Sequence, residues 1–171
     1  MRILLGHNST YYPSQGGGDK SNRLLMQALA ARGHDVRVVT RVEQFGVLAH
    51  EHYVALLTER GIVHEDMAGA VRAELSGVDA RTLTTEPNMR AYFAKQIAEF
   101  DPDVILVSTD DPAHLLLEPA LSAPRARVVY LVRATIAVPF GGDSSAQSAA
   151  KTERLRQVDG VVGVSESVAR Y

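Results

Sequence analysis

The chain has 171 residues, enough for one domain with a real hydrophobic core, and its formal net charge is −2 at pH 7. Acidic and basic residues are interspersed, which argues against a nucleic-acid or membrane-surface protein. The absence of cysteine excludes disulfides and thiolate metal sites. The apolar run before Gly6 is too short for a signal peptide or a membrane span, so we expect a cytoplasmic protein.

A strand, a glycine-rich loop and a helix open the chain. An apolar strand over residues 2–7 runs into a polar loop that ends in Gly16, Gly17 and Gly18, and a helical pattern follows over 19–32. Glycines before a helix let the backbone approach an anion, because no Cβ stands in the way, and the helix N-terminus favours negative charge. The pattern suits a phosphate or pyrophosphate, although a tight turn without a ligand also explains it.

Strands and helices alternate along the rest of the chain. Further strands are predicted over residues 36–40, 62–64, 82–85, 103–108, 127–132 and 160–164. Further helices are predicted over 48–59, 69–75, 88–100, 112–121 with Asp111 as its N-cap, 146–157, and from the cap Ser165 onward. The alternation predicts an α/β fold, a Rossmann-like three-layer α/β/α domain with a mainly parallel sheet.

Polar residues gather at one edge of this predicted sheet. Parallel strands point the same way, so the loops that follow their carboxyl ends lie together, and ligands bind there in such folds. The side chains brought to this edge include His7, Asn8, Asp110, Asp111, Arg133 and Thr135. We therefore expect them to surround the glycine loop.

Three stretches of the chain carry a family pattern. The first has two parts, 16–18 (Gly-Gly-Gly) before the first helix and 32–36 (Arg-Gly-His-Asp-Val) after this helix. The second is 100–105 (Phe-Asp-Pro-Asp-Val-Ile) and the third is 158–165 (Val-Asp-Gly-Val-Val-Gly-Val-Ser). In this order and spacing they resemble retaining glycosyltransferases of the GT-B fold, especially family 4, and residues 42–90 resemble them least.

The resemblance implies the N-terminal, acceptor-side half of a two-domain enzyme, with residues 1–171 as one Rossmann-like domain. The C-terminal domain, which holds most of the nucleotide sugar, would lie outside this chain, and the chain alone would be inactive. The implied reaction moves a sugar from a nucleotide-sugar donor to a small-molecule or glycan acceptor. The nucleotide-diphosphate sugar is a substrate, and neither a cofactor nor a metal is expected.

The resemblance also suggests site residues. The turn at 16–18 together with Lys20 would bind the donor diphosphate, and its oriented N–H groups would stabilise the departing charge. The acceptor-binding candidates are His7, Asn8, Asp110, Asp111, Arg133 and Thr135. The loops at 44–79 and 137–148 would shape the acceptor pocket.

Arg133 departs from the family pattern. In many members the strand that matches 127–132 ends in a histidine close to the reacting sugar, and Arg133 takes that place here. Arginine cannot act as a base, but it can hold a phosphate or carboxylate with two hydrogen bonds. Either the acceptor is anionic or the correspondence is shifted by a residue or two, and an ion pair with Asp110 or Asp111 is the plainer alternative. The catalytic candidates are Arg133, Asp110 and His7.

Other nucleotide-binding patterns fit less well. The segment 18–21 (Gly-Asp-Lys-Ser) is similar to a P-loop, but Asp19 puts a carboxylate where phosphate should lie. A dinucleotide-binding glycine pattern does not follow the first strand directly. A nucleotide-sugar epimerase of the same two-domain fold and a non-catalytic Rossmann-like binding module are the alternative functions.

Overall fold

The structure is a computed structural model that describes residues 1–43 and 46–170. Residues 44 and 45, at the start of the predicted acceptor loop 44–79, and residue 171, at the end of the last predicted helix, lie outside the described residues. The strands are β1 (Arg2–Gly6), β2 (Asp35–Arg41), β3 (His64–Met67), β4 (Ala70–Glu74), β5 (Val78–Leu83), β6 (Val104–Ser108), β7 (Arg127–Val132) and β8 (Gly160–Gly163). The helices are α1 (Gly17–Ala31), α2 (Val47–Glu59), α3 (Met89–Phe100), α4 (Leu117–Leu121), α5 (Ala149–Leu155) and α6 (Glu166–Ala169), with a 3₁₀ turn at Thr135–Ala137.

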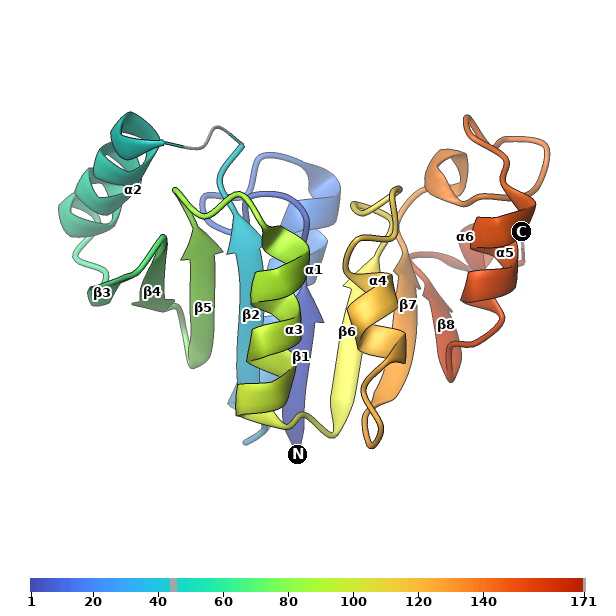
Figure 1. Cartoon of the computed structure of the whole chain (residues 1–171), viewed down its shortest axis with the longest axis horizontal. Helices are drawn as coiled ribbons and strands as arrows, with labels where there is room; N and C mark the ends of the chain where they lie inside the picture. The colour runs from blue at the N-terminus through green and yellow to red at the C-terminus, as the bar shows by residue number, and fades with distance from the viewer. Residues whose placement is uncertain (44–45, 171) are drawn as a thin grey trace.

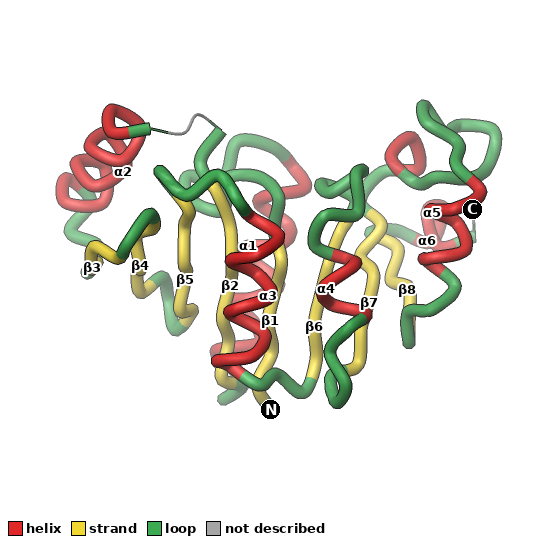
Figure 2. The backbone as a smooth tube through the Cα atoms, in the orientation of Figure 1, coloured by secondary structure: helices red, strands yellow, loops and turns green. Residues whose placement is uncertain are grey.

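The strands form one twisted sheet in the order β3-β4-β5-β2-β1-β6-β7-β8 (Figure 1). Among the described strands only β4 runs against its neighbours, and all other pairs are parallel. The tube view shows helices on both faces of the sheet (Figure 2). The predicted Rossmann-like, three-layer α/β/α fold with a mainly parallel sheet is confirmed.

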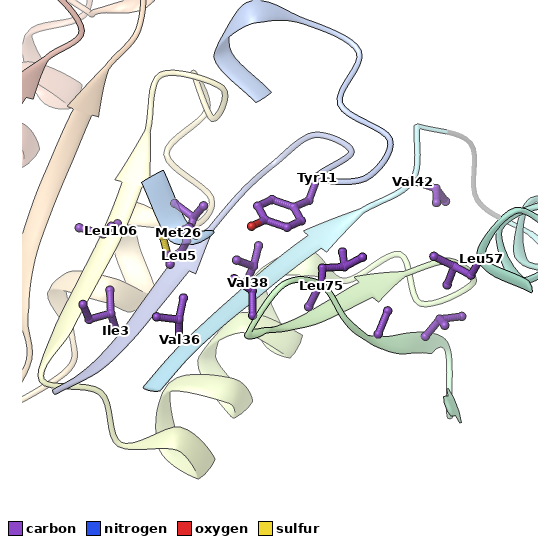
Figure 3. Packing of buried hydrophobic residues seen from close by; sticks show 14 of the residues in the cluster. Ile3, Leu5, Tyr11, Met26, Val36, Val38, Val42, Leu57, Leu75 and Leu106 are labelled. Atoms are coloured by element: carbon purple, nitrogen blue, oxygen red, sulfur yellow. The ribbon is translucent and has the colours of Figure 1, made fainter. Parts of the chain in front are cut away.

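Each face of the sheet has its own hydrophobic core. On one face Leu5 and Val38 pack with Met26 of α1, and α2 adds Leu57 (Figure 3). On the other face alternate strand residues pack against α3, α4 and α5. The central strands are apolar on both sides because both sides are covered, as is usual for parallel strands.

Several predicted elements need correction. Residues 69–75, predicted as a helix, contain strand β4, and the strands predicted at 62–64 and 82–85 occupy His64–Met67 and Val78–Leu83. Glycines in left-handed conformations, Gly69 (φ +77°) and Gly77 (φ +81°), turn the chain at both ends of β4 and produce a meander. Pairing with β5 thus outweighs the local helical preference of this segment.

The helix predicted from Pro112 is also wrong in its extent, since α4 begins at Leu117. His114 has a left-handed φ of +59°, which interrupts helical backbone. The Asp111 carboxylate does not cap a first turn but accepts the N–H of Leu116 at 2.7 Å. Ser165 is confirmed as an N-cap, because its side chain accepts the N–H of Val168.

The topology has a switch point between β1 and β6. From β1 the chain builds β2 and β5 on one side, and α3 then carries it across to β6 on the other side. The crossing is close, because a Cβ added to Gly6 would lie 2.7 Å from the Phe93 ring of α3. In doubly wound sheets, ligands bind outside the carboxyl ends of the strands at this point. Among the described helices, none is long and apolar enough to cross a membrane.

Candidate functional site

His7 lies at the end of β1, fully buried between two carboxylates. Its Nδ1 is 3.0 Å from Asp110 Oδ2, and its Nε2 is 3.3 Å from Asp19 Oδ1. Burial lowers the pKa of His7, but the hydrogen bonds and charges of the two aspartates outweigh it and raise the pKa to about 9. His7 is therefore protonated at neutral pH, and it ties the loop after β6 to the first turn of α1.

The Asp19 carboxylate is turned back toward the start of α1. Its Oδ2 accepts the N–H of Gly16 at 3.0 Å and that of Gln15 at 3.3 Å, and the hydrogen bond from His7 lowers the pKa of Asp19. The next N–H groups, at Gly17 and Gly18, belong to the first helical turn and have no acceptor inside the helix. They are available to an anion even though a carboxylate stands in the motif.

Asn22 joins the carboxyl ends of β6 and β7 to α1. Its Oδ1 accepts from Arg133 Nε at 2.9 Å and Nη2 at 2.5 Å, and its Nδ2 donates to Ser108 Oγ at 3.2 Å. The same Nδ2 lies 3.2 Å from His7 Nδ1. Sequence reasoning missed Asn22. Its position three residues after Asp19, on the same side of the helix, was the available signal.

Arg133 lies beside the first turn of α1. Besides its bonds to Asn22, its Nη1 donates to Ser21 Oγ at 3.1 Å, and a Cβ added to Gly18 would lie 3.9 Å from its Cβ. The expected direct ion pair is replaced by these bonds, and burial, which lowers the pKa of Arg133, is opposed by the charge of Asp110. We call His7, Asp19, Asn22, Asp110 and Arg133 the edge cluster.

The two aspartates after β6 are held by their own loop. Asp110 accepts the N–H of Asn8 at 2.5 Å through Oδ2 and the hydroxyl of Ser108 through Oδ1. Asp111 accepts from Asn8 Nδ2 at 3.3 Å and from the Leu116 N–H, and burial raises its pKa. Both carboxylates therefore have a clear structural role.

The glycine turn has no packing reason to be glycine. Gly16, the N-cap, has an extended φ of −126°. A Cβ added to Gly17 would meet nothing within 4 Å in the described part of the chain, and the nearest atoms at Gly16 and Gly18 would be at ordinary contact distances of 3.6 and 3.9 Å. The space over this turn is therefore open to a ligand rather than filled by the protein.

The family model described as glycosyl transferase 4-like domain matches residues 16–171. The chain belongs to this family. The match covers the glycine turn, the edge cluster apart from His7, and the last strand, so it confirms the resemblance seen in the sequence. A comparison with curated proteins finds no match.

Four of the candidate side chains in this glycosyl transferase 4-like domain lie outside the edge cluster: Asn8 and Asp111, which border it through their bonds in the loop after β6, and Lys20 and Thr135. Lys20 is exposed in the first turns of α1. Thr135 begins the 3₁₀ turn and its hydroxyl donates to Asp143 at 3.4 Å. Their roles in binding, like those of the other candidates, stay predictions.

A cavity of about 830 Å³ lies away from the carboxyl edge. It lies between α3 and α4, where Glu118 bridges Arg90 and Arg154 at 2.8 Å each. Its walls are mostly small and apolar side chains, and none of the candidate site residues lines it. In the described ranges, His, Asp and Glu side chains form no group of three or more suited to a metal ion.

Proposed function

We propose that this chain is the acceptor-side domain of a retaining, nucleotide-sugar-dependent glycosyltransferase. In this proposal the N-terminal turn of α1 contacts the donor diphosphate, and a C-terminal domain outside this chain holds the rest of the donor. The family membership supports a glycosyltransferase, and the site supports an anion at the switch point.

The observation that carries the proposal is the open glycine turn beside Arg133. The N–H groups of Gly17 and Gly18 have no partner among the described residues and lie at the positive end of a 15-residue helix, and Arg133 approaches Gly18 with its Cβ and Cγ. Arginine has five N–H donors, and the bonds to Asn22 and Ser21 use three of them, so two remain for a phosphate. An anion-binding role accounts for this arrangement, and it requires neither a general base nor a nucleophile.

These groups suit the chemistry of glycosyl transfer. Negative charge grows on the leaving diphosphate as the sugar departs, and oriented backbone N–H groups stabilise such charge without reorganisation. Arg133 adds a fixed positive charge, and Lys20 adds a second one that is screened by solvent. The acceptor hydroxyl would attack the same face of the sugar, which gives retention.

His7 has a supporting role in this scheme. It is buried and protonated, so it is neither a general base nor in direct contact with substrate. The Asp19 carboxylate lies at the first turn and accepts the Gly16 N–H, and its contact with His7 offsets the negative charge that a phosphate at this turn would meet. His7 thus prepares the turn for an anion.

The test is release of a nucleoside diphosphate by the product of the reading frame that encodes this sequence, incubated with a panel of UDP-, GDP- and ADP-sugars. We expect release with at least one donor, and at least a tenfold loss in Gly17→Val, because its side chain would fill the open space over the turn. Gly142→Val is the matched control, since a Cβ there also meets nothing within 4 Å of the described residues.

Three results would count against the proposal. Equal losses of nucleoside diphosphate release in Gly17→Val and Gly142→Val would mean that the glycine turn does not bind the donor. An epimerised donor sugar in place of a transferred one would indicate an epimerase. Binding of a nucleotide sugar with no release by the folded protein would indicate a non-catalytic binding module.

A further inference from the structure

The two ring nitrogens of His7 have different neighbours. Nδ1 is 3.0 Å from Asp110 Oδ2 and 3.2 Å from Asn22 Nδ2, whereas Nε2 lies 3.3 Å from Asp19 Oδ1. Among the described residues no donor forms a hydrogen bond with Nε2. The ring is fully buried, so both nitrogens depend on these neighbours rather than on water. Nδ1 thus has a donor beside it as well as an acceptor, and Nε2 has an acceptor alone.

Arg133 fixes the orientation of the Asn22 side-chain amide. A guanidinium only donates, so the amide atom 2.9 Å from Arg133 Nε and 2.5 Å from its Nη2 is the oxygen. The amide nitrogen then lies 3.2 Å from both Ser108 Oγ and His7 Nδ1, and it has one hydrogen for each of them. Asn22 can therefore donate to Nδ1, but only when that nitrogen carries no proton.

These contacts distinguish the two ways in which His7 can lose a proton. When both nitrogens are protonated, Nδ1–H points to Asp110 and Nε2–H points to Asp19. An unprotonated Nδ1 would accept from Asn22, but an unprotonated Nε2 would face a carboxylate with no donor among the described residues. Asp110 keeps its two other donors in either state. The proton therefore leaves from Nδ1, and Nε2–H stays with Asp19.

The loss of this proton changes the charge beside the glycine turn. Four elements bring titratable or charged groups toward His7: Tyr11 from the loop after β1, Asp19 from α1, Asp110 with the adjacent Asp111 from the loop after β6, and Arg133 from the end of β7 through Asn22. Burial raises the pKa of Tyr11, which keeps its hydroxyl neutral. While His7 is protonated, the edge cluster holds two positive and two negative charges, which cancel. Without the proton a net negative charge remains, and it would repel a phosphate at the turn.

We propose that the proton on His7 Nδ1 controls the affinity of the glycine turn for a phosphate group, and that Asn22 donates to this nitrogen when the proton leaves. The inference rests on the proposed function for the phosphate at the turn, but the titration of His7 can be measured without a ligand. Because the coupling is reciprocal, a bound phosphate holds the proton more tightly. The pairing of Nε2–H with Asp19 persists in both states, so the affinity changes while the fold of the turn is kept.

The first test is NMR of the chain labelled with ¹⁵N in its histidine rings and titrated from pH 6 to 11. In spite of burial, the two aspartates raise the pKa of His7 to about 9, so both ring nitrogens should be protonated at pH 7. At higher pH we expect Nδ1 to take the chemical shift of an unprotonated nitrogen, whereas Nε2 keeps its proton. Loss of the proton from Nε2, or a His7 that is neutral at pH 7, would overturn the proposal.

Asn22→Ala and Gln27→Ala are matched variants on α1 for the same titration. Without the Asn22 amide, an unprotonated Nδ1 has no donor, so we expect His7 to keep both protons down to a roughly tenfold lower proton concentration. In Gln27→Ala the titration should match that of the wild type. An unchanged titration of His7 in Asn22→Ala would overturn the role of Asn22, whatever the effect of this variant on stability.

The second test is the affinity for ADP at pH 7.5 and pH 10, followed by NMR in a Lys20→Ala background that removes the exposed ammonium from α1. ADP replaces UDP because uracil itself loses a proton in this range, whereas the charge of ADP stays constant. We expect about tenfold weaker binding at pH 10, because one buried positive charge near the turn is lost. Addition of His7→Gln should give the weaker affinity at both pH values.

The outcomes separate this proposal from the proposed function. ADP affinity that is equal at both pH values would overturn the proposal and leave the proposed function standing. No binding of ADP to the folded chain at either pH would overturn both, since the turn then binds no phosphate. Weaker binding at pH 10 together with no transferase activity in the product of the reading frame would uphold the proposal and count against the proposed function.

Discussion

The edge cluster and a second group of charges on the same sheet differ in what surrounds each charge. The second group, which we call the face cluster, consists of Arg37, Arg72, Asp79 and Arg81. Asp79 Oδ2 accepts from Arg37 Nε at 2.9 Å, and its Oδ1 accepts from Arg72 Nε at 2.8 Å. Arg37 also stands 4.3 Å from the centre of the Phe100 ring of α3.

The face cluster is bonded within the sheet and to α3, where Gln96 accepts from Arg37 and Glu99 lies 3.8 Å from Arg81. Arg37 and Asp79 are register partners on β2 and β5, so the pairing follows from the sheet itself, and Arg81 approaches the same carboxylate at 3.3 Å. The edge cluster instead draws its members from the first two turns of α1 and the ends of three strands, beside the Gly17 and Gly18 N–H groups, which have no partner among the described residues. Perturbed charges mark both places, and the position at the switch point is what distinguishes the edge cluster as a candidate ligand site.

The largest effect should come from breaking the face cluster. Burial favours a raised pKa for Asp79, but Arg72, Arg81 and Arg37 outweigh it and hold the pKa below its usual range. Asp79→Asn leaves three arginines together, and we expect a loss of about 3 kcal/mol in the free energy of unfolding in urea. Nucleoside diphosphate binding should not change.

The control for this prediction is Asp66→Asn, at an exposed carboxylate on β3, which should cost less than about 0.5 kcal/mol. The sign of the pH dependence follows from the lowered pKa. The contribution of Asp79 is full above the unfolded-state pKa near 3.9 and is lost as pH falls through the folded-state value. Stability that is indifferent to Asp79→Asn would contradict the assignment of the face cluster as structural.

The edge cluster should show the opposite pH dependence through His7. Its pKa rises from 6.5 to about 9 on folding, so its contribution is complete below pH 6.5 and is lost as pH rises through 9. The difference corresponds to about 3 kcal/mol at most. Urea unfolding between pH 6 and 10 should show this loss in the wild type and a flatter profile in His7→Gln. His52→Gln, at an exposed position on α2, is the control. The same flattening in that variant would contradict the assignment of the pH dependence to His7.

Asn22→Ala should lower both the free energy of unfolding and the affinity for a diphosphate. It removes the acceptor for two Arg133 N–H groups and the donor to Ser108, which we expect to cost about 2 kcal/mol of unfolding free energy. The guanidinium would no longer be fixed beside the turn, so diphosphate affinity, measured by calorimetry with UDP, should fall about tenfold. Gln27→Ala, on the same helix, is the matched control, and an equal fall there would exclude a positioning role for Asn22.

The sequence predicted the parts of the fold where local pattern and tertiary environment agree. The β1–α1–β2 unit and β6 have apolar runs bounded by glycine or by Asp-Pro, β7 is a continuous apolar run, and the predicted bounds of all of them fit within about two residues. β4 was missed because alanine, arginine and glutamate over 70–74 favour a helix locally, whereas the strand is stabilised by pairing with its neighbours.

The candidate site also contains residues that the sequence predicted and residues that it did not. His7, Asp110 and Arg133 follow strands, so topology alone places them at one edge. Asn22 is a polar residue inside a helix, and such a residue is usually solvated, so its spacing from Asp19 was the one sequence signal for its place in the site. The orientation of Asp19 was also out of reach, because it depends on His7, which lies 12 residues earlier and pairs with it only in the folded chain.

Lys20 should give the smallest effect, and it tests whether backbone or side chains hold the anion. It is exposed on α1, where solvent and salt screen its charge. We expect Lys20→Ala to weaken UDP binding about threefold at low salt and hardly at all at 0.5 M NaCl, with stability unchanged within about 0.5 kcal/mol. The loss in Gly17→Val should persist at high salt, because blocking the turn removes fixed N–H donors rather than a screened charge. If instead Lys20→Ala abolished binding at every salt concentration, the anion would depend on a mobile ammonium, and the open glycine turn would lose its claim to be the binding element.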